Sequence, residues 1–336
     1  MAVRRWDRDP RNYIGTVGDQ GQVCPLDVDG VRVHAVEWTP SGATNGRRVL
    51  LVHGLGANTL SWEPIGQPLA DVLSAPVTAI DLVGFGRTRS PGRPASISSN
   101  RRLVTAVLEQ LGPSIVVGNS MGGSIGIGVA ARRPDLVTSL VLVNPALPHP
   151  NPGVLDVLRF ARFAPVMFSS LGGPIVRTRA RMLGPERLVD LSLSWSLHDQ
   201  TRLDPDLRRR LIELAAERYD YPEAPGAYAE AARTLLLYLA RGLNTDLAKA
   251  DRAPVLIVHG EHDRLVSLLA ARAAAERNAH VELEVLDGIG HAPQLEAPDR
   301  LVGVMAAWLD ARMSAWQSPV PGSVSSTRRS APSSPS

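Results

Sequence analysis

Short apolar runs that end in polar or glycine-rich loops recur along the chain, and several are separated by apolar stripes with helical spacing. Runs of this kind are typical of strands buried on both faces of a sheet. Strands that alternate with helices predict a mostly parallel sheet covered by helices on both sides. The predicted strands are 49–52, 77–80, 115–117, 140–143, 255–258 and 281–285, and the clearest helical stripes lie in 103–111 and 301–309.

The N-terminal part of this pattern is different. Residues 31–37 alternate between apolar and polar side chains, and the turn signal Asp29-Gly30 separates them from the run 23–28. Two such segments joined by Asp-Gly predict an antiparallel hairpin, which we place at an edge of the sheet.

A long interval between Asn144 and Ala253 carries helical patterns and no strand pattern. We predict that it forms a helical cap inserted between two strands, with helices in 154–168, 188–197, 207–218 and 227–243. Phe160, Phe163 and Met167 in the first of these segments either attach the cap to the body or line an apolar substrate pocket. The predicted divisions are a flexible N-terminal segment (1–22), a core (23–146 and 249–313), the cap (147–248) and a disordered C-terminal tail (314–336).

Composition narrows the class of protein. The 336 residues are 44% apolar and carry a formal charge of +3, of which Arg328 and Arg329 in the tail supply two units. Residues 1–313 therefore hold 34 basic and 33 acidic side chains, which does not indicate a nucleic-acid partner. The single cysteine, Cys24, excludes an internal disulfide and a cysteine-based metal site. The charged N-terminus and the absence of a long apolar window predict no cleaved signal and no membrane span, so we expect a cytoplasmic protein; the sequence specifies no oligomeric state.

The candidate chemistry begins at Gly118-Asn119-Ser120-Met121-Gly122. This stretch follows a strand pattern and precedes a helix pattern rich in small residues. Glycines on both sides of Ser120 give the backbone room for a tight strand-to-helix turn. Such a turn holds a serine in a strained conformation with its hydroxyl exposed, which is how a serine becomes a nucleophile.

A serine nucleophile needs a base, and the base needs an acid that orients it. Asp263 lies in the loop after the predicted strand 255–258, and His291 lies in the loop after 281–285. Both loops follow the carboxyl ends of strands, where the ligand sites of parallel sheets are found. We therefore predict that Ser120, His291 and Asp263 form a catalytic triad.

Other residues compete for two of these roles. The rival of Asp263 is Glu261, which we interpret as a solvated loop charge because the spacing of Gly260, Asp263 and Val266 favours the aspartate. We expect Asp81 to anchor its own loop and the run 208–210 of three arginines to be a solvated face of the cap, with recognition of an acidic substrate as the alternative. The rivals of His291 are His53, which we expect to brace a neighbouring loop, His259, and His262, which we expect to be exposed.

Four motifs of the chain resemble those of the alpha/beta-hydrolase fold superfamily and follow one another in the same order. The resemblance is to the capped branch, which includes esterases, lipases, haloperoxidase-like enzymes and meta-cleavage-product hydrolases. Besides the serine turn, the motifs are the oxyanion loop at 52–56, the D-x-x-G-x-G-x-S/T loop at 81–88 and the histidine loop at 290–298. The resemblance runs from about Val31 to Trp308. It implies a mostly parallel sheet of eight strands flanked by helices, with a helical cap between two of the strands.

The resemblance also implies roles. Ser120 would attack a carbonyl carbon, His291 would carry the proton, and Asp263 would orient the imidazole. The backbone N–H groups of Leu55 and Met121 would stabilise the oxyanion. The family's other location for the acid holds Asn144, which cannot supply a carboxylate.

We therefore expect a serine hydrolase that acts on a small-molecule carboxylic ester with an apolar acyl group and needs neither a metal nor an organic cofactor. One alternative is a carbon–carbon bond hydrolase of the meta-cleavage-product type, since the serine turn with Asn119 resembles theirs. Against it, Ala292 stands where those enzymes commonly place tryptophan, and the oxyanion loop lacks their longer form. Further alternatives are acyl transfer to an alcohol or peroxide, and a ligand-binding receptor or scaffold with a slow triad.

Overall fold

The computed structural model describes residues 16–17, 21–89, 92–150 and 172–317. Phe160, Phe163 and Met167 lie outside these ranges, as does the whole predicted helix 154–168. Most of the N-terminal segment 1–22 and of the tail 314–336 also lies outside them.

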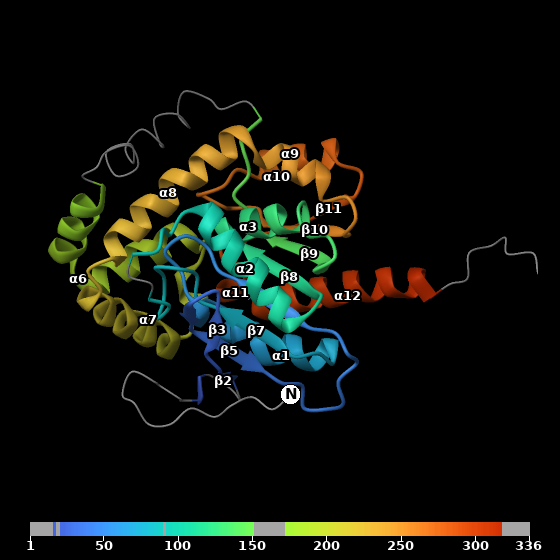
Figure 1. The fold of residues 1–336 in the computed structure, drawn as a ribbon, viewed down its shortest axis with the longest axis horizontal. Coiled ribbons are helices and arrows are strands. Elements are labelled where there is room, and N and C mark those ends of the chain that lie inside the picture. Colours follow the sequence, from blue (N-terminus) through green and yellow to red (C-terminus); the bar gives the residue numbers. More distant parts are fainter. Residues whose placement is uncertain (1–15, 18–20, 90–91, 151–171, 318–336) are drawn as a thin grey trace, which may run out of the picture.

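A mostly parallel sheet forms the centre of the described structure, which confirms the predicted fold class (Figure 1). It contains nine strands within the described residues, because the two-residue β1 pairs with β2 at the outer edge of the expected eight. All neighbours from β7 to β11 are parallel, whereas β1, β2 and β5 pair antiparallel. The spatial order is β1 (Thr16–Val17), β2 (Gly21–Val23), β5 (Ala35–Trp38), β7 (Val77–Ile80), β6 (Val49–Val52), β8 (Ser114–Asn119), β9 (Val137–Val143), β10 (Val255–Gly260) and β11 (Val281–Leu286).

The predicted N-terminal hairpin is present but does not join this sheet directly. β3 (Leu26–Val28) and β4 (Val31–Val33) pair antiparallel around Asp29-Gly30 and form a separate two-stranded sheet. Both turn residues have positive φ, as a tight two-residue hairpin requires. The chain leaves the main sheet after β2 and returns to it in β5, so the hairpin lies between two strands of that sheet in the sequence.

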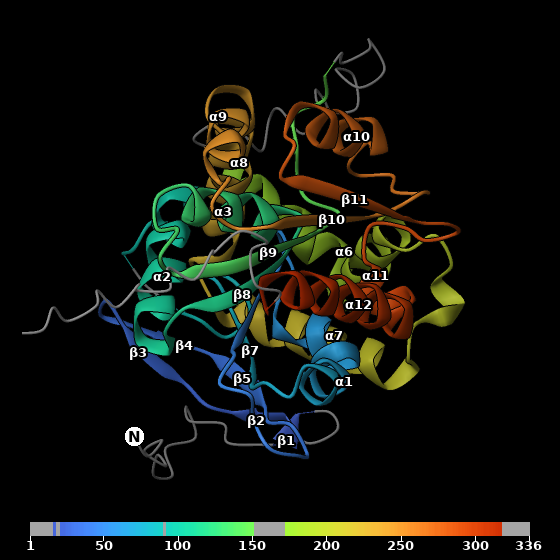
Figure 2. The same ribbon diagram turned by 90° about the vertical axis from the view of Figure 1, so that its right-hand side faces the viewer.

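Strand residues alternate between two cores because successive side chains point to opposite faces. In β6, Leu50 and Val52 belong to one apolar cluster, and Val49 and Leu51 belong to the other. Figure 2 shows α2 and α3 on one side of the sheet and α1 and α12 on the other. The helices of the body are α1 (Glu63–Leu73), α2 (Ile97–Leu111), α3 (Met121–Ala130), α10 (Leu268–Arg277), α11 (Pro293–Glu296) and α12 (Pro298–Gln317).

The regular elements described between β9 and β10 are all helices, and we refer to the described part of the predicted cap, 147–150 and 172–248, as the cap. α6 (Gly172–Ser196) contacts both α7 (Pro205–Glu217) and α8 (Ala224–Arg241), and the three lie together at one end of the molecule (Figure 1). α9 (Leu243–Lys249) follows and packs against α3. Short 3₁₀ turns complete the described elements at η1 (Thr59–Trp62), η2 (Gln200–Arg202) and η3 (Arg218–Asp220). No helix in the described ranges is both long and apolar enough to cross a membrane.

The parallel arrangement brings the loops after five strands to the same side of the sheet, at the carboxyl ends of the strands. His53 follows β6, Ser120 follows β8 and Asn144 follows β9. The loops that carry Asp263 and His291 follow β10 and β11. Residues far apart in the sequence can therefore meet at this side of the sheet.

Candidate active site

Ser120 occupies a sharp turn between β8 and α3. Its φ of 52° and ψ of −115° lie outside the regions that non-glycine residues favour. The turn is held on both sides, because Ser120 N–H donates to Val143 O at 3.1 Å and its own carbonyl accepts from Ala146 N at 3.1 Å. A strained backbone that its surroundings enforce is a recurrent property of nucleophile turns.

The glycines beside Ser120 allow α3 to lie directly against the strands. A Cβ added to Gly122 would lie 2.1 Å from Val52 O, and one added to Gly118 would lie 2.5 Å from the Gly122 carbonyl carbon. Neither position has room for a larger residue. Close packing of helix on strand places the start of α3, and with it Ser120, at the carboxyl edge of the sheet.

The loop after β6 packs against Ser120. A Cβ added to Gly54 would lie 3.1 Å from Ser120 Cβ. The backbone N–H groups of Leu55 and Met121 make no hydrogen bond within the described part of the chain. Two unengaged donors beside a candidate nucleophile are what the predicted oxyanion site requires.

His53 braces this loop, as expected. Leu82 N–H donates to His53 Nε2 at 3.0 Å, so Nδ1 carries the proton and donates to Gly54 O at 2.7 Å. Burial lowers the pKa of His53 despite the opposing effect of Asp81, and the ring therefore stays neutral. Asp81 in turn accepts from Thr59 N and Arg87 N, both at 2.7 Å, so it anchors its own loop.

The structure brings Asp263 and His291 together. His291 Nδ1 donates to Asp263 Oδ2 at 2.7 Å, and the Asp263 side chain is fully buried. The other oxygen, Oδ1, accepts from Leu265 N at 2.7 Å and Val266 N at 2.9 Å. Because Nδ1 carries the proton, Nε2 of His291 is the nitrogen available to accept a proton.

These contacts keep Asp263 ionised. Burial by itself raises the pKa of the carboxyl, but the charge and hydrogen bond of His291 outweigh it, with His259 and Val266 N–H assisting, and lower the pKa to about 2. Glu261, the rival of Asp263, and His262, a rival of His291, are both exposed.

Two residues whose part in the site the sequence did not indicate also contact Asp263. Asn144 Nδ2 donates to Asp263 Oδ2 at 2.8 Å, so the residue at the family's other acid location supplies a donor to the acid. His259 is buried, with Nε2 3.5 Å from Asp263 Oδ2 and 3.3 Å from Val266 O. Burial lowers the pKa of His259 despite the opposing effect of Asp263, so its imidazole is held neutral. The sequence places Asn144 at the family's other acid location and His259 among the candidates for the base, but neither pattern indicates a contact with Asp263.

Ser120 is connected to the Asp263–His291 pair through its neighbour. Asn119 Nδ2 donates to Val143 O at 3.0 Å and to His291 O at 3.2 Å. The side chain of Asn119 thus ties the serine turn to the histidine loop. Ser120 Oγ itself makes no hydrogen bond within the described residues; contacts of this kind often tighten only when substrate binds.

The cap arginines 208–210 are paired with acidic side chains. Arg208 contacts Asp190 and Glu186, and Arg209 contacts Asp206 and Glu213, all on the cap. Arg210 pairs with Asp206 on the cap and also reaches the body, where it pairs with the buried Glu63 at the start of α1. One of the three therefore attaches the cap to the body, which the run of identical residues did not indicate.

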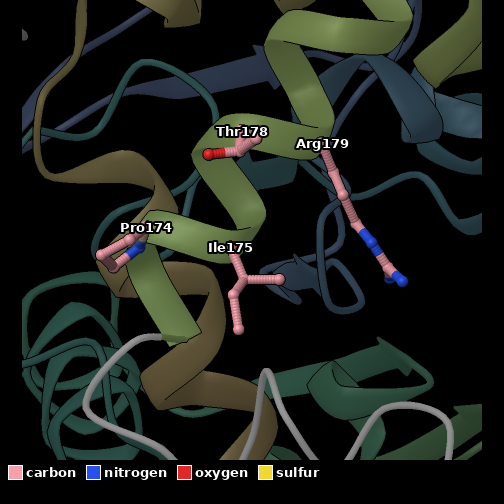
Figure 3. A pocket seen from close by; sticks show the side chains of 4 residues that line it. All are labelled: Pro174, Ile175, Thr178 and Arg179. Atoms are coloured by element: carbon pink, nitrogen blue, oxygen red, sulfur yellow. The ribbon is translucent and has the colours of Figure 1, made fainter.

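A hollow of about 270 Å³ lies on α6 (Figure 3). Pro174, Ile175, Thr178 and Arg179 line it, and all four come from the first part of that helix. It includes none of the predicted triad residues. The predicted pocket residues Phe160, Phe163 and Met167 lie outside the described residues. Across the described ranges, no group of three or more His, Cys, Asp and Glu side chains is placed to hold a metal ion.

The depressed pKa of Asp263 predicts how stability depends on pH. A carboxyl whose pKa is about 2 when folded and about 3.8 when free stabilises the fold above pH 4, and this stabilisation is lost as the pH falls towards 2. The shift corresponds to roughly 2 kcal/mol for a fully buried side chain. Urea unfolding at pH 4.5 and pH 2.0 should therefore show a smaller pH effect, by about this amount, in Asp263→Asn than in the wild type. Equal pH effects in the two proteins would contradict the ion pair.

The chain is similar to known lipases and esterases in sequence and to a known hydrolase in fold. The chain is 30% identical over 290 residues to lipase LipV of Mycobacterium tuberculosis, covering 84% of this chain and 99% of the relative. It is 28% identical over 294 residues to an esterase of the same organism, covering 83% and 87%. A meta-cleavage product hydrolase from Pseudomonas fluorescens IP01 has the same fold, with a TM-score of 0.66 at 20% identity over 90% of this chain and all of that one.

The sequence model of the family described as "alpha/beta hydrolase fold" matches residues 47–298, which include the serine turn, the Asp263 loop and His291. This match covers most of the chain and agrees with the strand order of the sheet. The chain belongs to the alpha/beta hydrolase fold family.

Proposed function

We propose that this protein is a serine hydrolase that cleaves a carboxylic ester with an apolar acyl group. The observation that carries the proposal is the hydrogen bond of 2.7 Å between His291 Nδ1 and the buried, ionised Asp263, at the sheet edge where Ser120 is held in a strained turn. An imidazole whose Nδ1 donates to a carboxylate directs Nε2 toward the nucleophile as the base.

The chemistry proceeds in two steps. Ser120 Oγ attacks the ester carbonyl carbon as its proton passes to His291 Nε2, and the Leu55 and Met121 N–H groups donate to the developing oxyanion. The imidazolium returns the proton to the departing alkoxide, which leaves the acyl group on Ser120. Water then attacks the acyl-enzyme with His291 as base, and this step releases the carboxylic acid and restores the serine.

The apolar acyl group is inferred from the cap. In the sequence, Phe160, Phe163 and Met167 give its first segment an apolar character, and we propose that they line the acyl pocket. Among the described residues, Tyr228 of α8 lies beside the oxyanion loop. A Cβ added to Gly56 would lie 3.2 Å from Tyr228 Cε2. The relatives named lipase and esterase support ester cleavage.

Asn119 does not favour carbon–carbon bond cleavage over ester cleavage. Its side-chain amide donates to the backbone carbonyls of Val143 and His291. These hydrogen bonds connect the serine turn to the histidine loop and explain the presence of an asparagine. Ester hydrolysis therefore stands as the proposed activity.

A panel of p-nitrophenyl esters from acetate to laurate tests the proposal, with a vinylogous diketone and a fluorophosphonate probe in parallel. We expect ester turnover that peaks at intermediate chain length, because an apolar pocket gains affinity with each methylene until it is filled. Cleavage of the diketone without any ester would show a carbon–carbon hydrolase instead. Failure of the probe to label the protein would favour a binding protein on the same fold.

A further inference from the structure

Glu296 belongs to the histidine loop 290–298 and is almost fully buried, with 3% of its surface exposed. It is the last residue of α11, five positions after His291. Its carboxylate accepts three backbone hydrogen bonds: from Gly290 N at 2.8 Å, from His198 N at 3.1 Å and from Asp199 N at 2.8 Å. Gly290 belongs to the histidine loop, whereas His198 and Asp199 belong to the cap. One side chain thus joins the two.

A second contact joins the same two segments. Ser196, the last residue of α6, accepts with its carbonyl from His291 N at 2.6 Å and from Ala292 N at 3.2 Å. The approach is close, since a Cβ added to Gly290 would lie 2.6 Å from both Ser196 O and His198 N. The backbone of His291 therefore rests directly on the cap.

The chemistry of the Glu296 side chain suits this contact between the histidine loop and the cap. Its three partners are all N–H donors, and an ionised carboxylate is a side chain that only accepts. Hydrogen bonds to a charged acceptor are also stronger than neutral ones. Glutamine would keep the shape but place its NH₂ group among donors, which would leave buried N–H groups unpaired.

Other attachments of the cap lie elsewhere. Arg210 pairs with Glu63 on α1, and Arg218 donates to Gly84 O at 2.8 Å and to Gly86 O at 2.6 Å in the loop after β7. None of these contacts involves the histidine loop. Segment 196–199, by contrast, makes hydrogen bonds to the backbone of His291 and to the carboxylate of Glu296, so its docking bears directly on His291.

We propose that Glu296 is a positioning residue that couples the cap to catalysis. By holding Gly290 against segment 196–199, it fixes the backbone of His291, so that the imidazole is correctly placed only while this part of the cap is docked. The cap then contributes to the chemical step as well as to substrate selection. The inference rests on the proposed function, because it assigns His291 as the base.

Glu296→Gln tests the coupling in the full-length protein, with the exposed Glu276→Gln on α10 as the matched control. Active sites are counted by exhaustive fluorophosphonate labelling, and assays are run well below the unfolding midpoint of each variant. We expect kcat per labelled site on a p-nitrophenyl ester to fall about 10²-fold, the usual effect of a displacement of about 1 Å, with KM changed by less than about threefold. The control should match the wild type.

Hydrogen exchange gives a readout independent of activity. Amides of 290–292 and 198–199 should exchange faster in Glu296→Gln than in the control, with the sheet unchanged. An unchanged kcat per site, or a lower kcat without faster exchange in these two segments, would overturn the proposal.

A second variant covers the case in which Glu296→Gln does not fold. Gly290→Ala leaves Glu296 in place but pushes segment 196–199 away, and it should also lower kcat per site with little change in KM. Activity of Gly290→Ala equal to the wild type would overturn the proposal. Labelling of the wild type that disappears in Ser120→Ala tests the proposed function separately, so failure of one is distinguishable from failure of the other.

Discussion

Ser120→Ala should lower kcat for ester hydrolysis by about 10⁶-fold, because it removes the atom that forms the acyl-enzyme. The oxyanion donors and the binding pocket stay in place, so a small residual rate above that of water is expected. Steady-state turnover of the best p-nitrophenyl ester gives the size of the loss. Covalent labelling by the fluorophosphonate should disappear in the same variant.

The matched control is Ser192→Ala, which changes an exposed serine on α6. It should keep wild-type turnover and labelling. The fold of Ser120→Ala should also persist, because alanine keeps a Cβ in the strained turn and the contacts of Gly118 and Gly122 are untouched. Turnover by Ser120→Ala within tenfold of the wild type would exclude Ser120 as the nucleophile.

Asp263→Asn should lower kcat by about 10⁴-fold. The substitution removes the charge that stabilises the imidazolium form of His291. Its new NH₂ group would also face His291 Nδ1 and Asn144 Nδ2, two donors in the present arrangement. His291 would then turn to the tautomer that carries its proton on Nε2, where it cannot act as a base.

The size and the pH dependence of this loss can be measured together. Because the pKa of Asp263 is about 2, this carboxylate is ionised at every pH at which the folded protein is assayed, and the loss should be similar from pH 6 to pH 9. Asp251→Asn, at an exposed aspartate before β10, serves as the control. If Asp263→Asn kept turnover near the wild-type value and Glu261→Gln were strongly impaired, Glu261 would be the acid that orients His291.

The strands and the serine turn could be predicted because their causes are local. A strand buried on both faces needs an apolar run, whereas β11, the last strand of the sheet, alternates valine or leucine with glutamate. The strands β6, β7, β8, β9, β10 and β11 all include the segments predicted for them. The glycines beside Ser120 are required by contacts within a few residues of the turn and by the adjacent strand. Such requirements leave a pattern in the sequence itself.

The site's connections depend on distant segments and left no such pattern. Asn144 stands at the family's other location for the catalytic acid, where it cannot supply a carboxylate. Its side chain donates a hydrogen bond to Asp263, which lies 119 positions further along the chain. Glu296 contacts the cap across 98 positions, and Arg210 alone of three adjacent arginines reaches the body.

The sequence by itself determined the fold class, the family resemblance and the candidate residues of the triad, because periodicity and turn chemistry act over short distances. Only the tertiary structure decided which carboxylate meets His291, which N–H groups are unengaged beside Ser120 and which part of the cap supports the histidine loop. The direction of a side chain and the register between strands set these contacts, and both emerge only when the whole chain has packed.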